Sequence, residues 1–145
     1  MFAITKRLRS TCTSHYLGKS YPKACKNVHG HNFFYEVTVK GEDLNQFDML
    51  VDFGDIKSHC DKWLQENWDH VHIFSTFQRE ERDLFDKMGW RWVEFPVDNA
   101  NVTSENMAKF LAKKFYEELK ALYSNITTVG VAVWETEDSK AYYEV

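Results

Sequence analysis

The sequence predicts a single α+β domain over residues 1–145, in which two helices pack on one face of an antiparallel sheet. Segments near both ends alternate apolar and polar residues with the period of two that is typical of strands. Two segments between them place apolar residues at helical spacing. The order is two strands, a helix, an irregular stretch, a helix and two strands, which differs from the regular alternation of doubly wound folds. No glycine-rich dinucleotide or phosphate-loop motif argues for such a fold.

The first part of the chain predicts two strands joined by a loop. Residues 2–15 are rich in threonine and β-branched residues, and their imperfect alternation allows a bulge. Gly18 and Pro22 indicate a loop over 16–28. Residues 30–40 alternate well and predict a strand. One of its faces carries Phe33, Tyr35, Val37 and Val39.

Two amphipathic helices follow this strand. Asp52 is a suitable cap for a helix over 53–66, and Thr103 or Ser104 caps a second helix. The apolar stripe of the second helix comprises Met107, Phe110, Leu111, Phe115, Leu119 and Leu122. Between the helices we expect a short helix over 79–88 and a short strand through Val93, Phe95 and Val97.

Two strands joined by a turn are expected to close the chain. Val129, Val131 and Val133 share one face of the first strand, and Glu135 continues that face. The second strand is expected over residues 140–145.

The composition is that of a globular domain with a sizeable core. Hydrophobic residues make up 43% of the chain and aromatic residues 16%, yet no apolar run is long enough to span a membrane. The three cysteines are Cys12, Cys25 and Cys60, an odd number with no close pair. A disulfide framework is therefore not expected, and a reducing compartment, the cytoplasm, is favoured.

The net charge of −4 is unevenly distributed along the chain. The first 35 residues contain basic residues and no acidic residue, whereas acidic residues predominate after them. We expect no nucleic-acid partner from this pattern, but a local basic pole suits a small polyanion such as a phosphorylated metabolite. Mitochondrial transit peptides are also basic and acid-poor; this segment lacks a clear amphipathic helix and leads into a histidine motif.

The segment KACKNVHGHN, residues 23–32, concentrates metal-binding side chains. His29 and His31 are two apart, so on a strand they lie on the same face, about 6–7 Å apart, and can bind one metal. His15 ends the preceding strand and is the best-placed third ligand if the two strands pair. Three histidines with an open fourth position form the ligand set of a catalytic zinc site.

Cys25 has two possible roles in such a site. As a fourth ligand it closes a structural site; as a free thiol it serves as a base or nucleophile, and Lys23 and Lys26 favour the thiolate. The spacing does not separate these roles. Cys12 and Cys60 are interpreted as inert.

Two further acidic positions are candidates for chemistry. Asp69 precedes His70, and a neighbouring carboxylate can orient an imidazole, although a solvated pair at a helix end is the simpler interpretation. Glu135 is a carboxylate on a valine face, either exposed at the sheet edge or held for a ligand with paired N–H donors. Glu105, in the first turn of a helix, is favoured there by the helix dipole.

Several motifs together resemble a known family. CKNVHGHN with an upstream histidine, VDFGDIK, WDH, TSEN and VWET occur in the order found in the 6-pyruvoyl-tetrahydropterin and 6-carboxy-tetrahydropterin synthases, and the resemblance covers residues 2–145. The Cys-x-x-x-His-Gly-His spacing is more similar to the bacterial 6-carboxy enzymes of queuosine biosynthesis. The resemblance implies the tunnelling fold (T-fold), trimers around a strand barrel that commonly stack in pairs as a hexamer, and active sites at subunit interfaces.

The resemblance also implies a carbon–carbon lyase that uses Zn²⁺ and no redox cofactor, with 7,8-dihydroneopterin triphosphate as substrate. By motif, zinc would bind to His15, His29 and His31. Cys25 would be the catalytic thiol, and Asp69 and His70 would form a proton-transfer pair. Glu135 would anchor the pterin ring. Thr103, Ser104 and Glu105 would line or support the pterin pocket, and Lys19, Lys23 and Lys26 would face the triphosphate.

Three departures from the family pattern bear on the substrate. Trp68 replaces the usual leucine before Asp-His, the following VHIFS lacks the usual Leu-Asn, and residues 75–100 match no family element. The alternatives are 6-pyruvoyl-tetrahydropterin synthesis and an aldolase-like cleavage; Ala24 and Lys26 beside the cysteine argue against the latter, whose enzymes carry a glutamate there. An alternative of another class is a non-enzymatic zinc-binding assembly module with Cys25 as fourth ligand.

Overall fold

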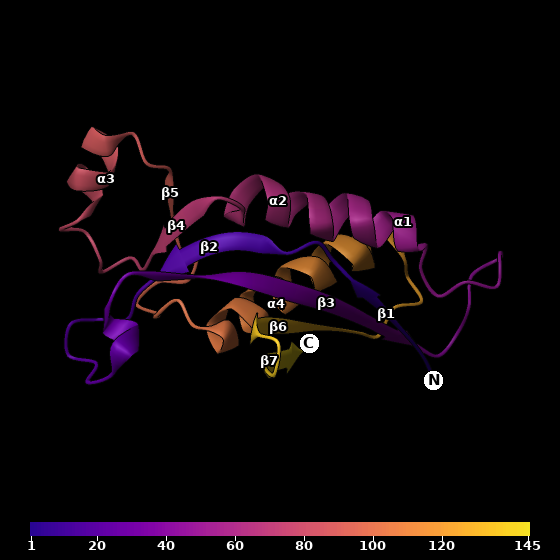
Figure 1. Cartoon of the computed structure of the whole chain (residues 1–145). Helices are drawn as coiled ribbons and strands as arrows, with labels where there is room; N and C mark the ends of the chain where they lie inside the picture. Colours follow the sequence, from indigo (N-terminus) through magenta and orange to yellow (C-terminus); the bar gives the residue numbers. More distant parts are fainter.

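The computed structural model describes all 145 residues and contains a seven-stranded sheet with helices packed on it (Figure 1). The strands are β1 (Phe2–Arg7), β2 (Thr11–His15), β3 (His29–Gly41), β4 (Val71–Phe74), β5 (Trp92–Glu94), β6 (Thr128–Thr136) and β7 (Ser139–Glu144). The helices are α1 (Phe53–Ile56), α2 (Lys62–Trp68), α3 (Arg82–Met88) and α4 (Ser104–Leu122), with a short 3₁₀ turn η1 (Ala24–Lys26). A π-helical segment, η2 (Lys57–Asp61), joins α1 to α2 into one continuous helical stretch.

The long strand β3 organises the sheet. It pairs with β1 and β2 along one side and with β6 along the other, and β7 lies beyond β6. All four of these pairings are antiparallel, as the alternating segments and short connections predicted. The α+β class is therefore confirmed.

The sheet is nevertheless mixed, so the expectation of a purely antiparallel sheet is wrong at one end. β4 pairs parallel with β2, and β5 pairs parallel with β4. β4 was not predicted as a strand because all four of its residues are buried, which removes the alternation that marks a half-exposed strand. β5 covers only part of the expected segment, although the neighbouring Phe95 is fully buried.

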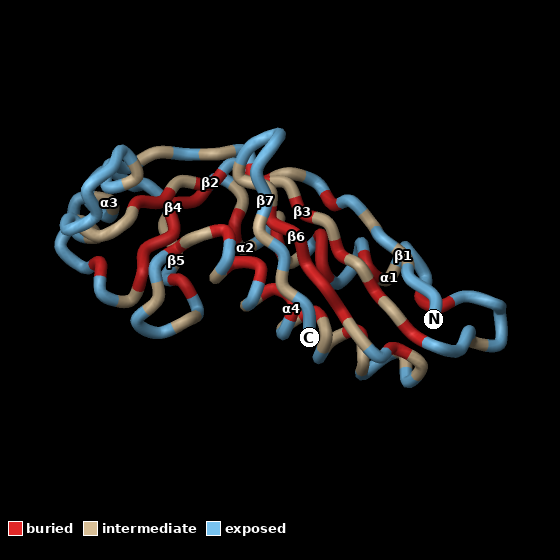
Figure 2. Tube along the Cα trace, turned by 90° about the horizontal axis from the view of Figure 1, so that it is seen from below, coloured by how far each residue is buried: buried red, intermediate tan, exposed pale blue.

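The core lies between this sheet and the helices on one of its faces. Phe33, Tyr35, Val37 and Val39 of β3 are fully buried, as are the valines predicted for β6. Figure 2 shows the buried stretches of β3 and β6 in red. Four members of the apolar stripe of α4 are also fully buried: Met107, Leu111, Phe115 and Leu119. Phe110 is only partly buried, and Leu122 is 52% exposed because it ends the helix.

Caps and aromatic packing fix where the helices begin and end. The Asp52 side chain accepts a hydrogen bond from the Gly54 amide at 2.7 Å, and Thr103, rather than Ser104, caps α4. α2 extends to Trp68, two residues beyond the expected end. Trp68 is buried against Phe110, so the chain leaves the helix at a fixed position immediately before Asp69.

Residues 75–100 form an excursion at the end of the sheet farthest from the N-terminus (Figure 1). It contains α3 and β5, and Arg82 of α3 forms an ion pair with Glu94 of β5 at 2.8 Å. β5 is thus the edge strand of the sheet, and the ion pair links α3 to it. None of the helices is long and apolar enough to cross a membrane.

Candidate active site

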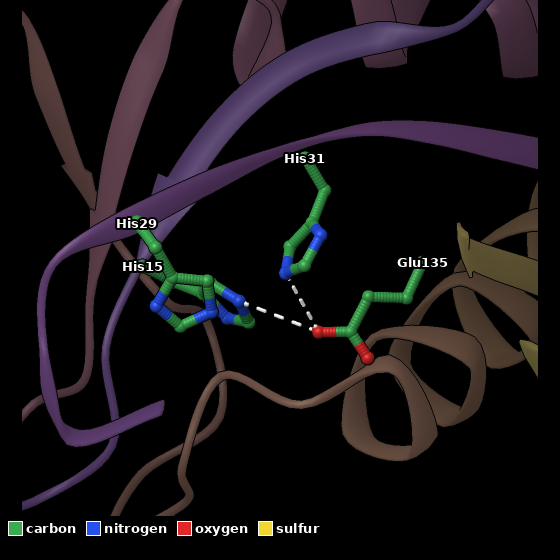
Figure 3. A group of neighbouring side chains, drawn as sticks. All are labelled: His15, His29, His31 and Glu135. Carbon is green, nitrogen blue, oxygen red and sulfur yellow. Dashed lines mark ion pairs between the residues drawn. The ribbon is translucent and has the colours of Figure 1, made fainter. Parts of the chain in front are cut away.

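The structure brings together the three histidines that the sequence singled out as metal ligands (Figure 3). The antiparallel register of β2 and β3 places His15 directly opposite His29, and His31 lies two residues further along β3 on the same face. The centroid of the His15 ring is 4.6 Å from that of His29 and 5.2 Å from that of His31. His15 is buried, while His29 and His31 are partly exposed.

Backbone carbonyls hold two of these rings in the orientation that a metal requires. His15 Nδ1 lies 2.6 Å from the carbonyl oxygen of Val102, and His29 Nδ1 lies 2.6 Å from that of Asn27. If each Nδ1 donates its proton, each Nε2 carries a lone pair. The Nε2 atoms of all three histidines are buried without a hydrogen-bond partner. Buried polar atoms are costly when unpaired, so this cluster fits a metal site.

Glu135 of β6 completes the cluster. Its Oε1 lies 2.9 Å from His31 Nε2 and 3.6 Å from His15 Nε2 (Figure 3), and the four potential ligand atoms lie within 4.8 Å of one another. The close contact with the His15 ring, and after it the charges of the neighbouring imidazoles, outweigh burial and hold the pKa of Glu135 below its usual value. Burial lowers the pKa of His31, which favours the neutral, metal-binding imidazole. A set of imidazole and carboxylate ligands suits zinc and similar divalent ions.

Cys25 lies outside this cluster. It occupies the turn η1, where its side chain is partly exposed and its carbonyl oxygen accepts a hydrogen bond from the Leu17 amide at 2.8 Å. The group of potential ligands contains no cysteine. A single chain therefore does not form a closed metal site of three histidines and one cysteine.

Asp69 and His70 form a second constellation directly after α2. His70 Nδ1 lies 2.8 Å from Asp69 Oδ2, while Asp69 Oδ1 accepts the Cys12 amide at 2.9 Å. Burial raises the pKa of Asp69, but the hydrogen bonds from the Cys12 amide and the His70 ring outweigh it, and the pKa lies below its usual value. The carboxylate is thus charged at neutral pH and orients an imidazole whose side chain is 78% exposed.

The pair borders an open cavity of about 790 Å³. Cys12, Ser14 and Asn32 also line it, and by strand alternation they lie on the face of the sheet opposite His15 and His31. Phe85, Trp90 and Arg91 of the 75–100 excursion form its outer wall. His31 also contributes to the cavity lining, but strand alternation places its side chain with His15 on the other face. A single chain therefore presents the metal cluster and His70 on opposite faces of its sheet.

Comparison with known proteins identifies the family. A model of the 6-pyruvoyl tetrahydropterin synthase family matches residues 3–145. The chain belongs to this family. Its members are lyases, so the chain is assigned as an enzyme of that class.

Several relatives support the same assignment. The chain is 36% identical to a 6-carboxy-5,6,7,8-tetrahydropterin synthase from Aquifex aeolicus, over 83% of this chain and 75% of that protein. It is 28% identical to the Haemophilus influenzae protein of the same name, over 99% of both chains. The solved 6-pyruvoyl tetrahydropterin synthase from Plasmodium vivax shares the fold, with a TM-score of 0.75 over 100% of this chain and 99% of that chain at 15% identity. This confirms the T-fold.

The TSEN segment of the family pattern lies beside the metal cluster. Val102, whose carbonyl oxygen accepts the His15 hydrogen bond, immediately precedes Thr103. Ser104 is buried, whereas Glu105 is exposed in the first turn of α4. The start of α4 therefore lies next in sequence to the carbonyl group that contacts His15, and the pterin role expected for Thr103, Ser104 and Glu105 stays a prediction.

The lysines proposed for the triphosphate lie in different surroundings. Lys19 forms an exposed ion pair with Glu80 at 2.7 Å, so much of its charge is already compensated. Lys23 and Lys26 are exposed beside Cys25 and form no ion pair. Only the latter two keep an uncompensated charge.

The structure also reveals residues that sequence reasoning missed. Cys12 is exposed in the cavity beside His70, and His72 is buried, with Nδ1 2.8 Å from Ser14 Oγ and a pKa that burial lowers to about 4. Arg91 reaches backbone carbonyls on either side of the α2 C-terminus. No sequence motif marks such contacts, because a backbone carbonyl is present at every residue.

Proposed function

We propose that this enzyme is a zinc-dependent 6-carboxy-5,6,7,8-tetrahydropterin synthase. The reaction would convert 7,8-dihydroneopterin triphosphate and water to 6-carboxytetrahydropterin, acetaldehyde and triphosphate, a step of queuosine biosynthesis. The convergence of three histidine Nε2 atoms carries the proposal, because it matches the ligand set of a catalytic zinc site. The names of the sequence relatives support the 6-carboxy product over the 6-pyruvoyl product.

In this proposal His15, His29 and His31 would hold the zinc ion. Bound there, zinc would supply Lewis acidity toward the oxygens of the substrate side chain. The Val102 and Asn27 carbonyls keep the Nδ1 protons of two ligands in place, so the Nε2 atoms stay available to the metal.

Two protein groups would move protons on the substrate. The Cys25 thiolate would remove a proton from the substrate side chain, and exposed Lys23 and Lys26 would attract the triphosphate. His70 would transfer the second proton through Nε2, since Asp69 holds Nδ1.

These groups would meet between subunits. One chain presents His70 and its metal cluster on opposite faces of the sheet, so the proposed reaction needs a second copy that brings the His70 face of one subunit to the cluster of another. We therefore propose a homo-oligomer, a trimer or a pair of stacked trimers, which fits the unpaired edges of β1 and β7.

Glu135 is proposed to anchor the pterin ring rather than to bind the metal. Its carboxylate is 30% exposed, and its two oxygens match paired N–H donors on the heterocycle. Glu135→Gln is expected to retain the metal and to raise KM by roughly tenfold or more, because a charge-assisted hydrogen bond is lost. Metal analysis and steady-state kinetics check this. Loss of the metal, and with it of turnover, would show that Glu135 is a ligand instead.

The function is tested by incubating the zinc-loaded protein with 7,8-dihydroneopterin triphosphate. We expect acetaldehyde and 6-carboxytetrahydropterin in equal amounts, measured by a coupled alcohol dehydrogenase assay and by mass spectrometry. A 6-pyruvoyl product without acetaldehyde would assign the other activity of the family. No turnover by the zinc-loaded protein would contradict the proposal.

A further inference from the structure

His70 is held in an unfavourable backbone conformation. Its φ of 54° lies in the left-handed region, which residues with a Cβ atom rarely adopt. Such conformations persist only where the surrounding structure holds them, and they cluster at functional sites. The contacts that hold His70 therefore bear directly on where its ring points.

One side of the His70 turn is held by Cys12 of β2. The Cys12 carbonyl oxygen accepts the His70 amide at 2.8 Å, and the Cys12 amide donates to Asp69 Oδ1 at 2.9 Å. Both contacts use backbone atoms of Cys12, so they follow from the position of β2 and do not depend on the thiol.

The other side is held by Arg91 of the 75–100 excursion. Its Nη2 donates to the Glu66 carbonyl at 2.6 Å, and its Nη1 lies 3.5 Å from the Asp69 carbonyl. Its own carbonyl oxygen accepts the His72 amide at 3.1 Å. The contacted residues therefore lie both before and after His70 in the chain. The position of the guanidinium group is also favourable, because the C-terminal carbonyls of a helix such as α2 attract a cation.

Arg91 has no carboxylate partner among the ion pairs of the chain, so the polar contacts of its guanidinium group are with these carbonyls. It also lines the cavity that His70 borders. We propose that Arg91 is a positioning residue that fixes the His70 turn and thereby aims the His70 ring. This proposal rests on the proton-transfer role proposed for His70, and it assigns a task to the 75–100 excursion.

The first test compares Arg91→Ala, Arg91→Lys and Arg91→Met with Arg79→Ala in the full-length, zinc-loaded protein. Arg79 is a matched control, since it is an exposed arginine of the same excursion whose Nε donates to the Thr76 carbonyl at 3.0 Å. For Arg91→Ala we expect kcat to fall roughly tenfold with KM within about twofold and metal content unchanged. Arg91→Lys should recover only part of the lost kcat, because it keeps the charge but an ammonium group cannot donate to two carbonyls as a guanidinium group does. Arg79→Ala should match the wild type.

A double-mutant cycle shows whether Arg91 acts through His70. In a His70→Ala background, Arg91→Ala is expected to cause no further loss of kcat, because the ring that it positions is absent. A further tenfold loss in that background would overturn the proposal, and so would an unchanged kcat in the single variant.

A measurement without turnover separates this proposal from the proposed function. Hydrogen–deuterium exchange of the peptide around Asp69–His72 is expected to be faster in Arg91→Ala than in the wild type, and unchanged in Arg79→Ala. If Arg91→Ala does not fold, Arg91→Lys and Arg91→Met provide the comparison. Unchanged exchange at this peptide would overturn the proposal even if the wild type proves active, whereas faster exchange in a protein without turnover would contradict only the proposed function.

Discussion

Replacing His31 by alanine is expected to remove the bound metal and, with it, all measurable turnover. His31 supplies one of three converging Nε2 atoms, and its side chain is 19% exposed, so its loss should disturb the core less than loss of buried His15. Removing only an outer hydrogen-bond partner of a metal ligand costs roughly 10–100-fold in affinity, and removing the ligand itself should cost more.

Metal analysis of the purified His31→Ala protein after dialysis checks this prediction. The matched control is His59→Ala, because His59 is an exposed histidine on the helical stretch that contains α2, away from the cluster. The control should keep about one metal ion per chain and full activity. Full metal occupancy in His31→Ala would show that the histidine cluster is not the metal site.

Replacing His70 or Cys25 by alanine is expected to lower kcat by roughly 10²–10⁴-fold while the metal stays bound, since positioned proton transfer contributes about that much. Neither residue belongs to the cluster of potential ligands. Kinetics and metal analysis of both variants check this. A loss of zinc in Cys25→Ala would favour the structural-site alternative, and wild-type turnover in His70→Ala would refute the role of the Asp69–His70 pair.

The same His70→Ala variant tests whether the site is shared between subunits. Oligomers reassembled from equal amounts of His31→Ala and His70→Ala chains would contain sites that combine an intact cluster from one chain with an intact His70 from its neighbour. We expect roughly a quarter of wild-type activity per site from random mixing. If each chain held a complete site of its own, the mixed oligomers would remain inactive.

Much of the metal cluster was predictable because it depends on local pattern and on one pairing. The spacing of His29 and His31 fixes their common face as soon as the segment is a strand. His15 joins them because β2 and β3 pair in the register that places it opposite His29. Glu135 was recognised as an unusual carboxylate on an apolar face, but its position beside the histidines depends on the pairing of β3 with β6.

The region after α2 was much less predictable. β4 is buried on both faces and has no alternation, and β5 is three residues long. Their parallel pairing joins segments far apart in the chain, which no local pattern encodes. The short helix α3 was expected from its composition, but its place along the wall of the His70 cavity was not.

The sequence by itself determined the α+β class, the approximate start of the two main helices, the faces of the main strands and the choice of the three histidines, because each follows from residue type and spacing along the chain. Only the tertiary structure decided that Cys25 lies outside the metal cluster, that His70 occupies the opposite face of the sheet in a left-handed conformation, and that Arg91 brackets it. These features depend on which distant segments pack together and on contacts to backbone atoms, and backbone atoms leave no signature in the sequence.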